Sequence, residues 1–352
     1  MAIDDAEADA ADTRAGQLSI WLLVLAGLVF VILVVGGATR LTESGLSIVK
    51  WDPVTGIVPP LNNADWQAKF DAYRMTPEYR LINQGMDLGE FKTIFLWEYL
   101  HRVLGRVLGL AMAIPFVWFL VKRAIPRGYG WRLGSLVLLV GLQGAIGWWM
   151  VASGLVDRPD VAHQRLALHL TTALVLLSAL IWTALDLRAL AARRDPIDGR
   201  PRSWFWPFLV LLFVQITFGA FIAGLDAGHM FTTWPTMQGE WVPSALTYLR
   251  RFWTNAIDNP ATVQFIHRWL AMVLAVYAVV VAVRLYRSGA GWRAIALAAT
   301  VLLQFLLGVL TLVNSVPIPL GVAHQAGAVL LLVATLVAGH WSMGMDSSSE
   351  SP

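Results

Sequence analysis

Long apolar runs constrain this chain more than any other feature of its sequence. Eight of them reach about 20 residues, the length at which an α-helix crosses the hydrocarbon core of a bilayer. Only 14% of the residues are charged, whereas a soluble domain carries roughly 25%. The sequence has no cysteine, which excludes disulfides and thiolate metal sites. These features exclude a soluble enzyme, a disordered chain and a secreted disulfide scaffold, and they predict an all-α integral membrane protein.

The apolar runs predict eight transmembrane helices. They cover approximately residues 19–38, 94–121, 133–152, 162–185, 205–225, 262–284, 294–314 and 321–341. Lys and Arg, which tend to stay on the cytoplasmic side, gather in the loops after the second, fourth and sixth of these helices. Both termini are therefore expected inside the cell. Residues 1–18 are expected to form a cytoplasmic tail, and the Ser-rich residues 342–352 a disordered one.

The two halves of the chain resemble each other. The matched segments are Val-Ala-His-Gln at 161–164 and 322–325, Gln143 with Gln304, Gly147 with Gly308, and residues 100–102 with 266–268. Because each unit contains four predicted helices, an even number, both copies have the same orientation and the repeat is parallel. We therefore expect two pseudo-symmetric four-helix bundles, at 19–185 and 205–341, joined by a cytoplasmic linker at 186–204.

Four histidines occupy matching places near the outer ends of the even-numbered predicted helices. They are His101, His163, His267 and His324. Two neutral imidazoles facing each other form a suitable axial ligand pair for haem iron. Polar groups inside a bilayer are costly and tend to be functional, so one haem is predicted in each half, between the two histidines of that half. The alternative is a structural role in helix capping or interhelical hydrogen bonding. Zinc is disfavoured because no third ligand recurs.

The other three histidines are predicted not to bind a metal. His169 follows His163 by six residues, about 240° around the helix, and is expected to point elsewhere. His229 falls in an outer loop and His340 at the end of the last helix.

One carboxylate breaks the symmetry between the halves. Glu98 precedes His101 by three residues, on the same helical face, and the matching position in the second half is Gln264. A carboxylate can take a proton or stabilise a developing cation, whereas an amide does neither well. The chemistry is therefore predicted in the first half, with Glu98 as its catalytic residue. The alternative is a helix-end salt bridge between Glu98 and Arg102.

Two further residue types have less specific interpretations. Arg102 and Arg268 follow the matched histidines and could each hold a haem propionate, or they could extend toward the membrane interface. Glycines on the first three predicted helices form stripes of small residues along each helix. These stripes are expected to let helices pack closely rather than to bind a cofactor. The glycines are Gly36, Gly37, Gly105, Gly109, Gly141, Gly144 and Gly147.

Taken together, these motifs resemble the haem A synthase family from the first helix to the last. The motifs are GGATRLTESGLS at 36–47, WEYLHR at 97–102, AHQ at 162–164, AGLDAG at 223–228, FIHR at 265–268 and AHQ at 323–325. Some members of the family carry a cysteine pair in the first outer loop. This sequence lacks that pair and resembles the cysteine-free subgroup of bacterial and mitochondrial type.

The resemblance implies an oxidoreductase that converts the C8 methyl group of haem O to a formyl group, in two successive hydroxylations, to give haem A for cytochrome oxidase assembly. It implies that haem O binds between His101 and His163, and a haem b cofactor between His267 and His324. Glu98 matches the family's functional acid. The resemblance also implies a multi-pass protein of the cell inner membrane, in contact with lipid and partnered by a haem O synthase. The electron acceptor and the oxygen source stay open, and no nucleic-acid partner is expected.

Two other classes of protein compete with this interpretation. A di-haem b-type electron-transfer protein would keep both haems as permanent cofactors, but the difference between Glu98 and Gln264 argues against such a symmetric role. A transporter built on a repeat would need polar groups and broken helices near the midplane, and the sequence offers neither.

Overall fold

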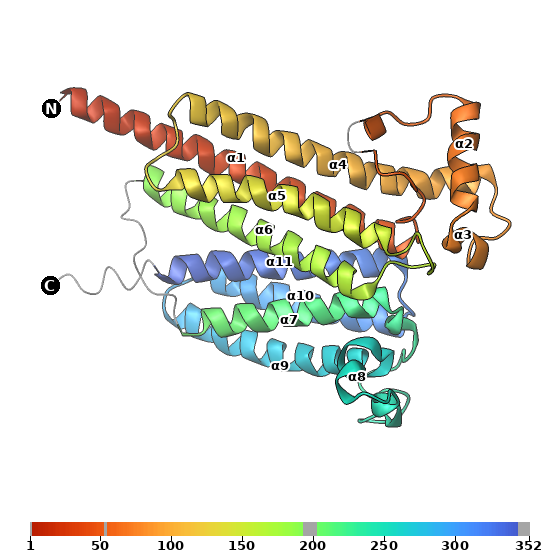
Figure 1. The fold of residues 1–352 in the computed structure, drawn as a ribbon. Coiled ribbons are helices and arrows are strands. Elements are labelled where there is room, and N and C mark those ends of the chain that lie inside the picture. The colour runs from red at the N-terminus through yellow and green to blue at the C-terminus, as the bar shows by residue number, and fades with distance from the viewer. Residues whose placement is uncertain (1, 53–54, 193–202, 344–352) are drawn as a thin grey trace.

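Eight long helices make up most of the protein (Figure 1). The structure, a computed structural model, describes residues 2–52, 55–192 and 203–343. The long helices are α1 (Ala2–Leu41), α4 (Leu88–Val121), α5 (Tyr129–Ala152), α6 (His163–Ala191), α7 (Phe205–Gly224), α9 (Pro260–Arg287), α10 (Trp292–Val313) and α11 (Ile318–Met343). All eight contain a stretch long and apolar enough to span a membrane. The described residues contain no strand, and the chain is an all-α, multi-pass membrane protein.

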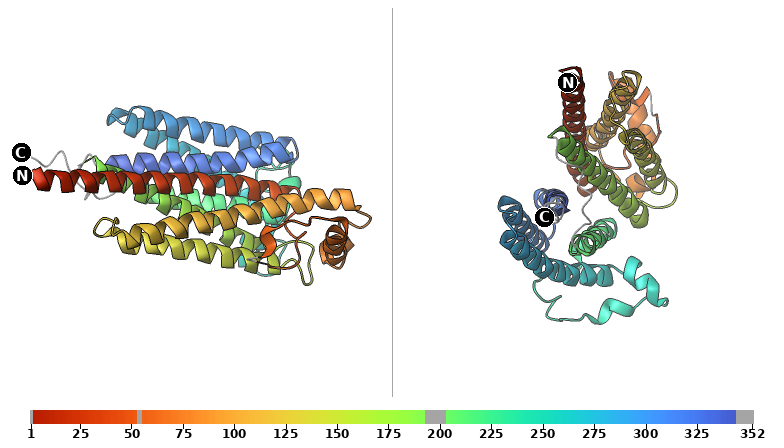
Figure 2. Two further views of the ribbon diagram at one scale, coloured as in Figure 1. Left: turned by 90° about the horizontal axis from the view of Figure 1, so that it is seen from above. Right: turned by 90° about the vertical axis from the view of Figure 1, so that its left-hand side faces the viewer.

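The long helices form two adjacent groups of four (Figure 2). In the first group α1 packs against α4 and α6, and α5 packs against the same two helices, so that α4 and α6 lie at opposite corners. In the second group α9 and α11 lie at opposite corners in the same way, each packed against α7 and α10. The two groups meet where α6 contacts α7, α1 contacts α11, and α6 contacts α11. Buried Leu, Ala, Val and Phe side chains from both groups form one continuous core.

Most helix boundaries lie within a few residues of those predicted, but two helices begin earlier. The first helix extends back to Ala2, through the segment predicted as a separate tail, because that segment is rich in alanine, the strongest helix former. Helix α4 begins at Leu88 because Asp87 and Glu90 form a capping box at its start. The predicted linker at 186–204 lies partly within α6, and its residues 193–202 are outside the described residues. The predicted disordered tail is also outside them, apart from its first two residues.

Polar contacts join the two groups of helices at both ends of the bundle. At one end the guanidinium of Arg40 on α1 lies 3.0 Å from the carboxylate of Asp226, which follows α7. At the other end Asp186 on α6 binds the imidazole of His340 on α11 at 2.8 Å and the guanidinium of Arg132 on α5. The contacts of Arg40 with Asp226 and of Asp186 with His340 thus link the first group of helices to the second at both ends.

Shorter helices form the outer segments. Residues 42–87 contain η1 (Thr55–Ile57), α2 (Asn63–Arg74) and α3 (Pro77–Leu81), and residues 225–259 contain η2 (Ala227–His229), η3 (Ser244–Thr247) and α8 (Phe252–Asp258). We call α2 and α3 the outer cap. Its Phe70 and Tyr73 are buried against Phe91 and Phe95 on α4, in a separate aromatic cluster.

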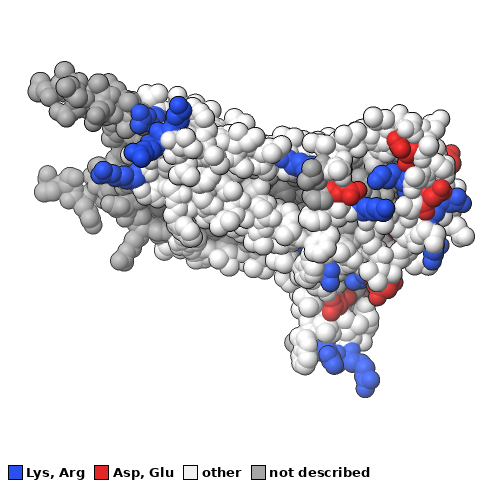
Figure 3. All heavy atoms as spheres, turned by 45° about the horizontal axis from the view of Figure 1, so that its top comes forward, with Lys and Arg blue, Asp and Glu red and all other residues white. Residues whose placement is uncertain are grey.

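The charged side chains lie mainly at the two ends of the molecule on the face shown in Figure 3. Lys and Arg gather at the end where α1 begins and α11 ends, and charges of both signs gather at the end that carries the outer cap. The surface between the two ends is almost free of charge (Figure 3). An uncharged belt of this kind matches the hydrocarbon layer of a bilayer.

A buried carboxyl lies in the outer cap. Glu78 on α3 is 3% exposed, and its Oε2 has no hydrogen-bond partner. Burial raises the pKa of Glu78 to about 8, although a hydrogen bond with Tyr73 acts in the opposite direction. The nearby negative charges of Glu98, Asp160 and Glu43 raise this pKa further. The folded cap therefore keeps a proton that the unfolded segment releases.

We predict that the stability of the outer cap depends on pH through Glu78. Between the ordinary pKa of 4.5 and the folded value of about 8 the folded cap binds the extra proton, so its stability falls as pH rises, by up to about 1.4 kcal/mol per pH unit. Above pH 8 the loss is complete. Amide hydrogen exchange of residues 63–81, corrected for intrinsic rates, measures this fall. Glu78→Gln should abolish it and Asp71→Asn, at an exposed position on α2, should keep it. An unchanged pH dependence in Glu78→Gln contradicts the prediction.

Candidate functional site

Four imidazoles inside the bundles each lie against a glycine of a neighbouring helix. A methyl group added to any of these glycines would lie 2.9 to 3.2 Å from the Cε1 atom of the imidazole. The four pairs, which we call glycine seats, are Gly36 with His101, Gly147 with His169, Gly219 with His267, and Gly308 with His324. Only a residue without a side chain lets the ring and the neighbouring helix come this close.

The glycine seats place two imidazoles in each group of helices. His101 on α4 and His169 on α6 stand at opposite corners of the first group, and His267 on α9 and His324 on α11 at opposite corners of the second. Imidazoles at opposite corners can face each other across the bundle axis. Each group can therefore present two nitrogen ligands to one central metal.

The structure corrects one of the four predicted ligands. His169, which we predicted to point elsewhere, lies on the Gly147 seat with its Nδ1 3.1 Å from the side-chain amide of Gln143. His163, which we predicted to face His101, points instead to α8 in the second outer segment. Its Nε2 lies 3.0 Å from the carbonyl oxygen of Ile257 and 3.0 Å from Asp258 Oδ1.

The correction follows from the length of one connection. Helix α6 begins at His163 and α11 begins at Ile318, so His169 and His324 are each the seventh residue of their helix. The connection at 153–162 is longer than the one at 314–317, and this difference moves the repeated Ala-His-Gln motif away from its structural counterpart. His169 could have been identified by counting residues from the start of each helix, because it matches His324 in that count. A comparison of short motifs does not take the start of the helix into account.

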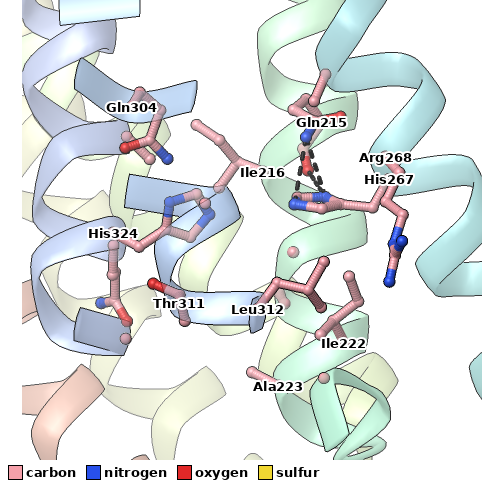
Figure 4. A pocket seen from close by; sticks show the side chains of 18 of the residues that line it. Gln215, Ile216, Ile222, Ala223, His267, Arg268, Gln304, Thr311, Leu312 and His324 are labelled. Atoms are coloured by element: carbon pink, nitrogen blue, oxygen red, sulfur yellow. Dashed lines mark hydrogen bonds between the residues drawn. The ribbon is translucent and has the colours of Figure 1, made fainter. Parts of the chain in front are cut away.

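A cavity of about 290 Å³ lies inside the second group of helices, bordered by His267 and His324 (Figure 4). The two imidazoles come from α9 and α11, with their ring centroids 6.5 Å apart and their planes at 81°. Because a bond between a metal and an imidazole nitrogen is about 2 Å long, one metal ion bound to both rings would leave their centroids about 6 Å apart. The observed separation of the centroids is close to that value.

Several buried polar atoms around this cavity have no partner within the described residues. Nδ1 of His324 and the Nε atoms of Arg40 and Arg268 make no hydrogen bond, and all three residues line the cavity. His267, by contrast, is held by Gln215 (Figure 4): its Nδ1 lies 3.1 Å from the backbone carbonyl oxygen of Gln215, and the side-chain amide nitrogen of Gln215 lies 3.1 Å from Nδ1 and 3.3 Å from Nε2. Buried polar atoms without partners are rare in folded proteins, and here they fit a bound group with a metal and an anionic edge.

Glu98 in the first group of helices is fully engaged by hydrogen bonds. Its Oε1 accepts from Nε and NH2 of Arg102 at 3.0 and 2.6 Å. Its Oε2 accepts from Ser47 Oγ and from the backbone N–H of Ile48, both at 2.7 Å. The side chain is 3% exposed. The helix-end salt bridge that the sequence left as an alternative is therefore present, and it ties α4 to the segment that follows α1.

The arginines that follow the matched histidines bind outer segments in both halves. Arg102 donates to the carbonyl oxygens of Ile48 and Lys50 as well as to Glu98. Arg268 donates to three carbonyl oxygens, those of Phe231, Thr233 and Thr236. Gln264, the counterpart of Glu98, donates to the carbonyl oxygens of Ala227 and Phe231. Of the two arginines for which propionate contact and extension toward the interface were left as alternatives, Arg268 lines the cavity and Arg102 does not.

The remaining histidines have separate surroundings. His340 binds Asp186 near the other end of the bundle, and His229 borders the cavity from η2. Among the described residues no cluster of three or more His, Asp or Glu side chains could hold a metal ion.

Comparison with known proteins places the chain in a family. The family model described as cytochrome oxidase assembly protein matches residues 19–336. The haem A synthase of Sphingopyxis alaskensis is 49% identical over 331 residues, which cover 93% of this chain and 92% of that protein. The haem A synthase of Rhizorhabdus wittichii is 50% identical, with 95% of each chain covered, and that of Rhodospirillum centenum is 47% identical, with 95% of this chain and 90% of that protein covered. The chain belongs to the haem A synthase family. The resemblance indicated by its motifs is confirmed.

We predict that His169, and not His163, is required for ligand binding in the first group of helices. His169→Ala should remove the absorption of the first bound haem and leave that of the second, because it deletes the ring held against Gly147. His163→Gln is the matched control six positions earlier on the same helix, and it should keep both. The measurement is the low-temperature absorption spectrum with a count of haem per chain. Loss of the first haem in His163→Gln, with retention in His169→Ala, would contradict the prediction.

Proposed function

We propose that this protein is a haem A synthase, which oxidises the C8 methyl group of haem O to a formyl group in two successive hydroxylations and so supplies haem A for cytochrome oxidase assembly. The observation that carries the proposal is 47–50% identity to three haem A synthases over at least nine-tenths of each chain. Two imidazoles on opposite corners of each membrane-spanning group of helices support it, because an apolar porphyrin needs such a site.

The second group of helices is proposed to hold haem b as a resident cofactor. His267 and His324 would hold its iron, and the partnerless Nε atoms of Arg268 and Arg40 could bind its acidic groups. The 6.5 Å separation of the rings and the unpaired buried nitrogens support this assignment. When bound, haem b supplies one-electron redox chemistry.

The first group of helices is proposed to hold the substrate, haem O, between His101 and His169. His101 lies on the Gly36 seat of α1 and His169 on the Gly147 seat of α5, so both rings have their orientation fixed by packing. This rigid arrangement would hold the substrate in one position relative to the outer segment at 44–50, which is consistent with oxidation at a single peripheral carbon.

Glu98 is proposed to act by positioning that outer segment. Both of its oxygens already accept hydrogen bonds, so taking a proton would first break one of them. Together with Arg102 it forms an ion pair one helical turn from His101 and fixes Ser47 and Ile48 above the first imidazole pair. A direct catalytic role of Glu98, as predicted from the sequence, stays a prediction.

The enzyme is proposed to lie in the cell inner membrane with both termini in the cytoplasm. The bacterial relatives support a place in the cell inner membrane, and the Lys and Arg at one end of the bundle support cytoplasmic termini. A haem O synthase is the expected partner that delivers the substrate. The electrons removed from the methyl group need an acceptor, whose identity the site geometry does not fix.

Extraction of the haems from the purified protein tests the proposal. A haem A synthase should carry haem b together with haem O or haem A, identified by mass. Haem b alone, with no conversion of added haem O, would instead identify a di-haem electron-transfer protein and overturn the proposal.

We predict that Glu98→Gln lowers haem A output by about a hundredfold while haem b stays bound, since the amide cannot pair with the Arg102 guanidinium. Glu98→Asp keeps the charge and should restore part of the output, which a purely steric role would not explain. The measurement is the ratio of haem A to haem O in membranes that contain each variant. Normal haem A output from Glu98→Gln excludes the role.

A further inference from the structure

Glycines on α4 and α5 leave open space beside the first imidazole pair. A methyl group added to Gly105 or Gly109 on α4, or to Gly144 on α5, would meet no atom within 4 Å. Gly105 lies one turn beyond His101 on the same face, and Gly144 lies one turn before Gly147 on its face. These glycines differ from the four glycine seats, where the added methyl group would contact an imidazole.

The glycine seats can be used to align the two groups of helices, and this alignment shows which residues of the second group correspond to these glycines. Counting from His101 and His267, Gly105 corresponds to Ala271 and Gly109 to Ala275. Counting from Gly147 and Gly308, Gly144 corresponds to Phe305. All three counterparts line the cavity that His267 and His324 border. Phe305 also packs edge to face against Trp234, with ring centroids 5.7 Å apart. Side chains therefore fill in the second site the places that are empty in the first.

The helix that carries Gly144 is also the least covered by protein. Only 6% of the apolar stretch of α5 is buried within the molecule, against 44% for α6. Because Gly105 lies one turn from His101, and Gly144 one turn from the Gly147 that contacts His169, these glycines lie near the first imidazole pair, on two helices that pack against each other. A hydrophobic group that extends from a porphyrin held between His101 and His169 could pass there into the bilayer.

We propose that Gly105, Gly109 and Gly144 form the part of the first site that admits the long hydrophobic tail by which haem O differs from haem b. The inference rests on the proposed function and assigns its substrate selectivity. The tail lies between α4 and α5 toward lipid, and the substrate and product exchange through this side. The second site retains the tail-less haem b because Ala271, Ala275 and Phe305 occupy the equivalent space.

The experiment gives the first site the side chains of the second. Gly105→Ala with Gly144→Phe is purified from cells that make haem O, and each haem is counted per chain by mass. We expect haem b to stay at the wild-type level, which reports an intact fold, and haem O plus haem A to fall about tenfold or more. The matched control is Gly130→Ala on α5, whose added methyl group also meets no atom within 4 Å and which should keep both haems.

Other outcomes separate this inference from the proposed function. Wild-type amounts of haem O and haem A in the double variant overturn the inference and leave the proposed function standing. Absence of haem O and haem A from the wild-type protein itself overturns the proposed function. If the double variant also loses haem b, the single variants Gly105→Ala and Gly109→Ala decide. Each adds one methyl group to open space, and a kcat/KM for haem O equal to that of Gly130→Ala overturns the inference.

Discussion

An imidazole held against a glycine near the middle of a four-helix group is the contact on which the rest of this structure depends. A polar ring inside a membrane is costly unless it is buried and bonded to a partner. The glycine lets two helices approach until the ring reaches the centre of the bundle, and the same contact occurs four times, on α1, α5, α7 and α10. The same contact therefore determines both how the helices pack and where the imidazole nitrogens lie. A helix that moved outward would carry its imidazole away from the centre of the group.

The two sites share this contact and differ around it. In the first, an ion pair between Glu98 and Arg102 ties the outer segment to α4, whereas Gln264 in the second makes only neutral hydrogen bonds to its segment. At the positions that correspond to Gly105, Gly109 and Gly144 of the first half, the second has Ala271, Ala275 and Phe305, which line its cavity. Two sites with the same imidazole arrangement but different neighbouring residues suit a protein that keeps one porphyrin and transforms and releases the other.

Much of the fold could be predicted from local features. Apolar length gave all eight membrane helices. The largest errors fell at the starts of α1 and α4, where the alanine-rich leader and the capping box at Asp87 extend the helix beyond the apolar run, and at the end of α6, which continues to Ala191. Three of the four seated histidines, His101, His267 and His324, were also identified. The structure places His169, and not His163, against a glycine of the first group, because a short motif repeats at 161–164 and 322–325 while the preceding connections differ in length.

Apolar length, the absence of cysteine and the family motifs were enough to establish a helical membrane protein of the haem A synthase family, because each of these is a property of a continuous stretch of chain. Which histidine faces which, and which arginine is already occupied by carbonyl oxygens, depended on how far each helix is displaced along its axis. A displacement of six residues moves a side chain by about 9 Å and turns it to another face. Only the packing of neighbouring helices against their glycines sets that displacement, so the contact of His169 with Gly147 is a result of the tertiary structure.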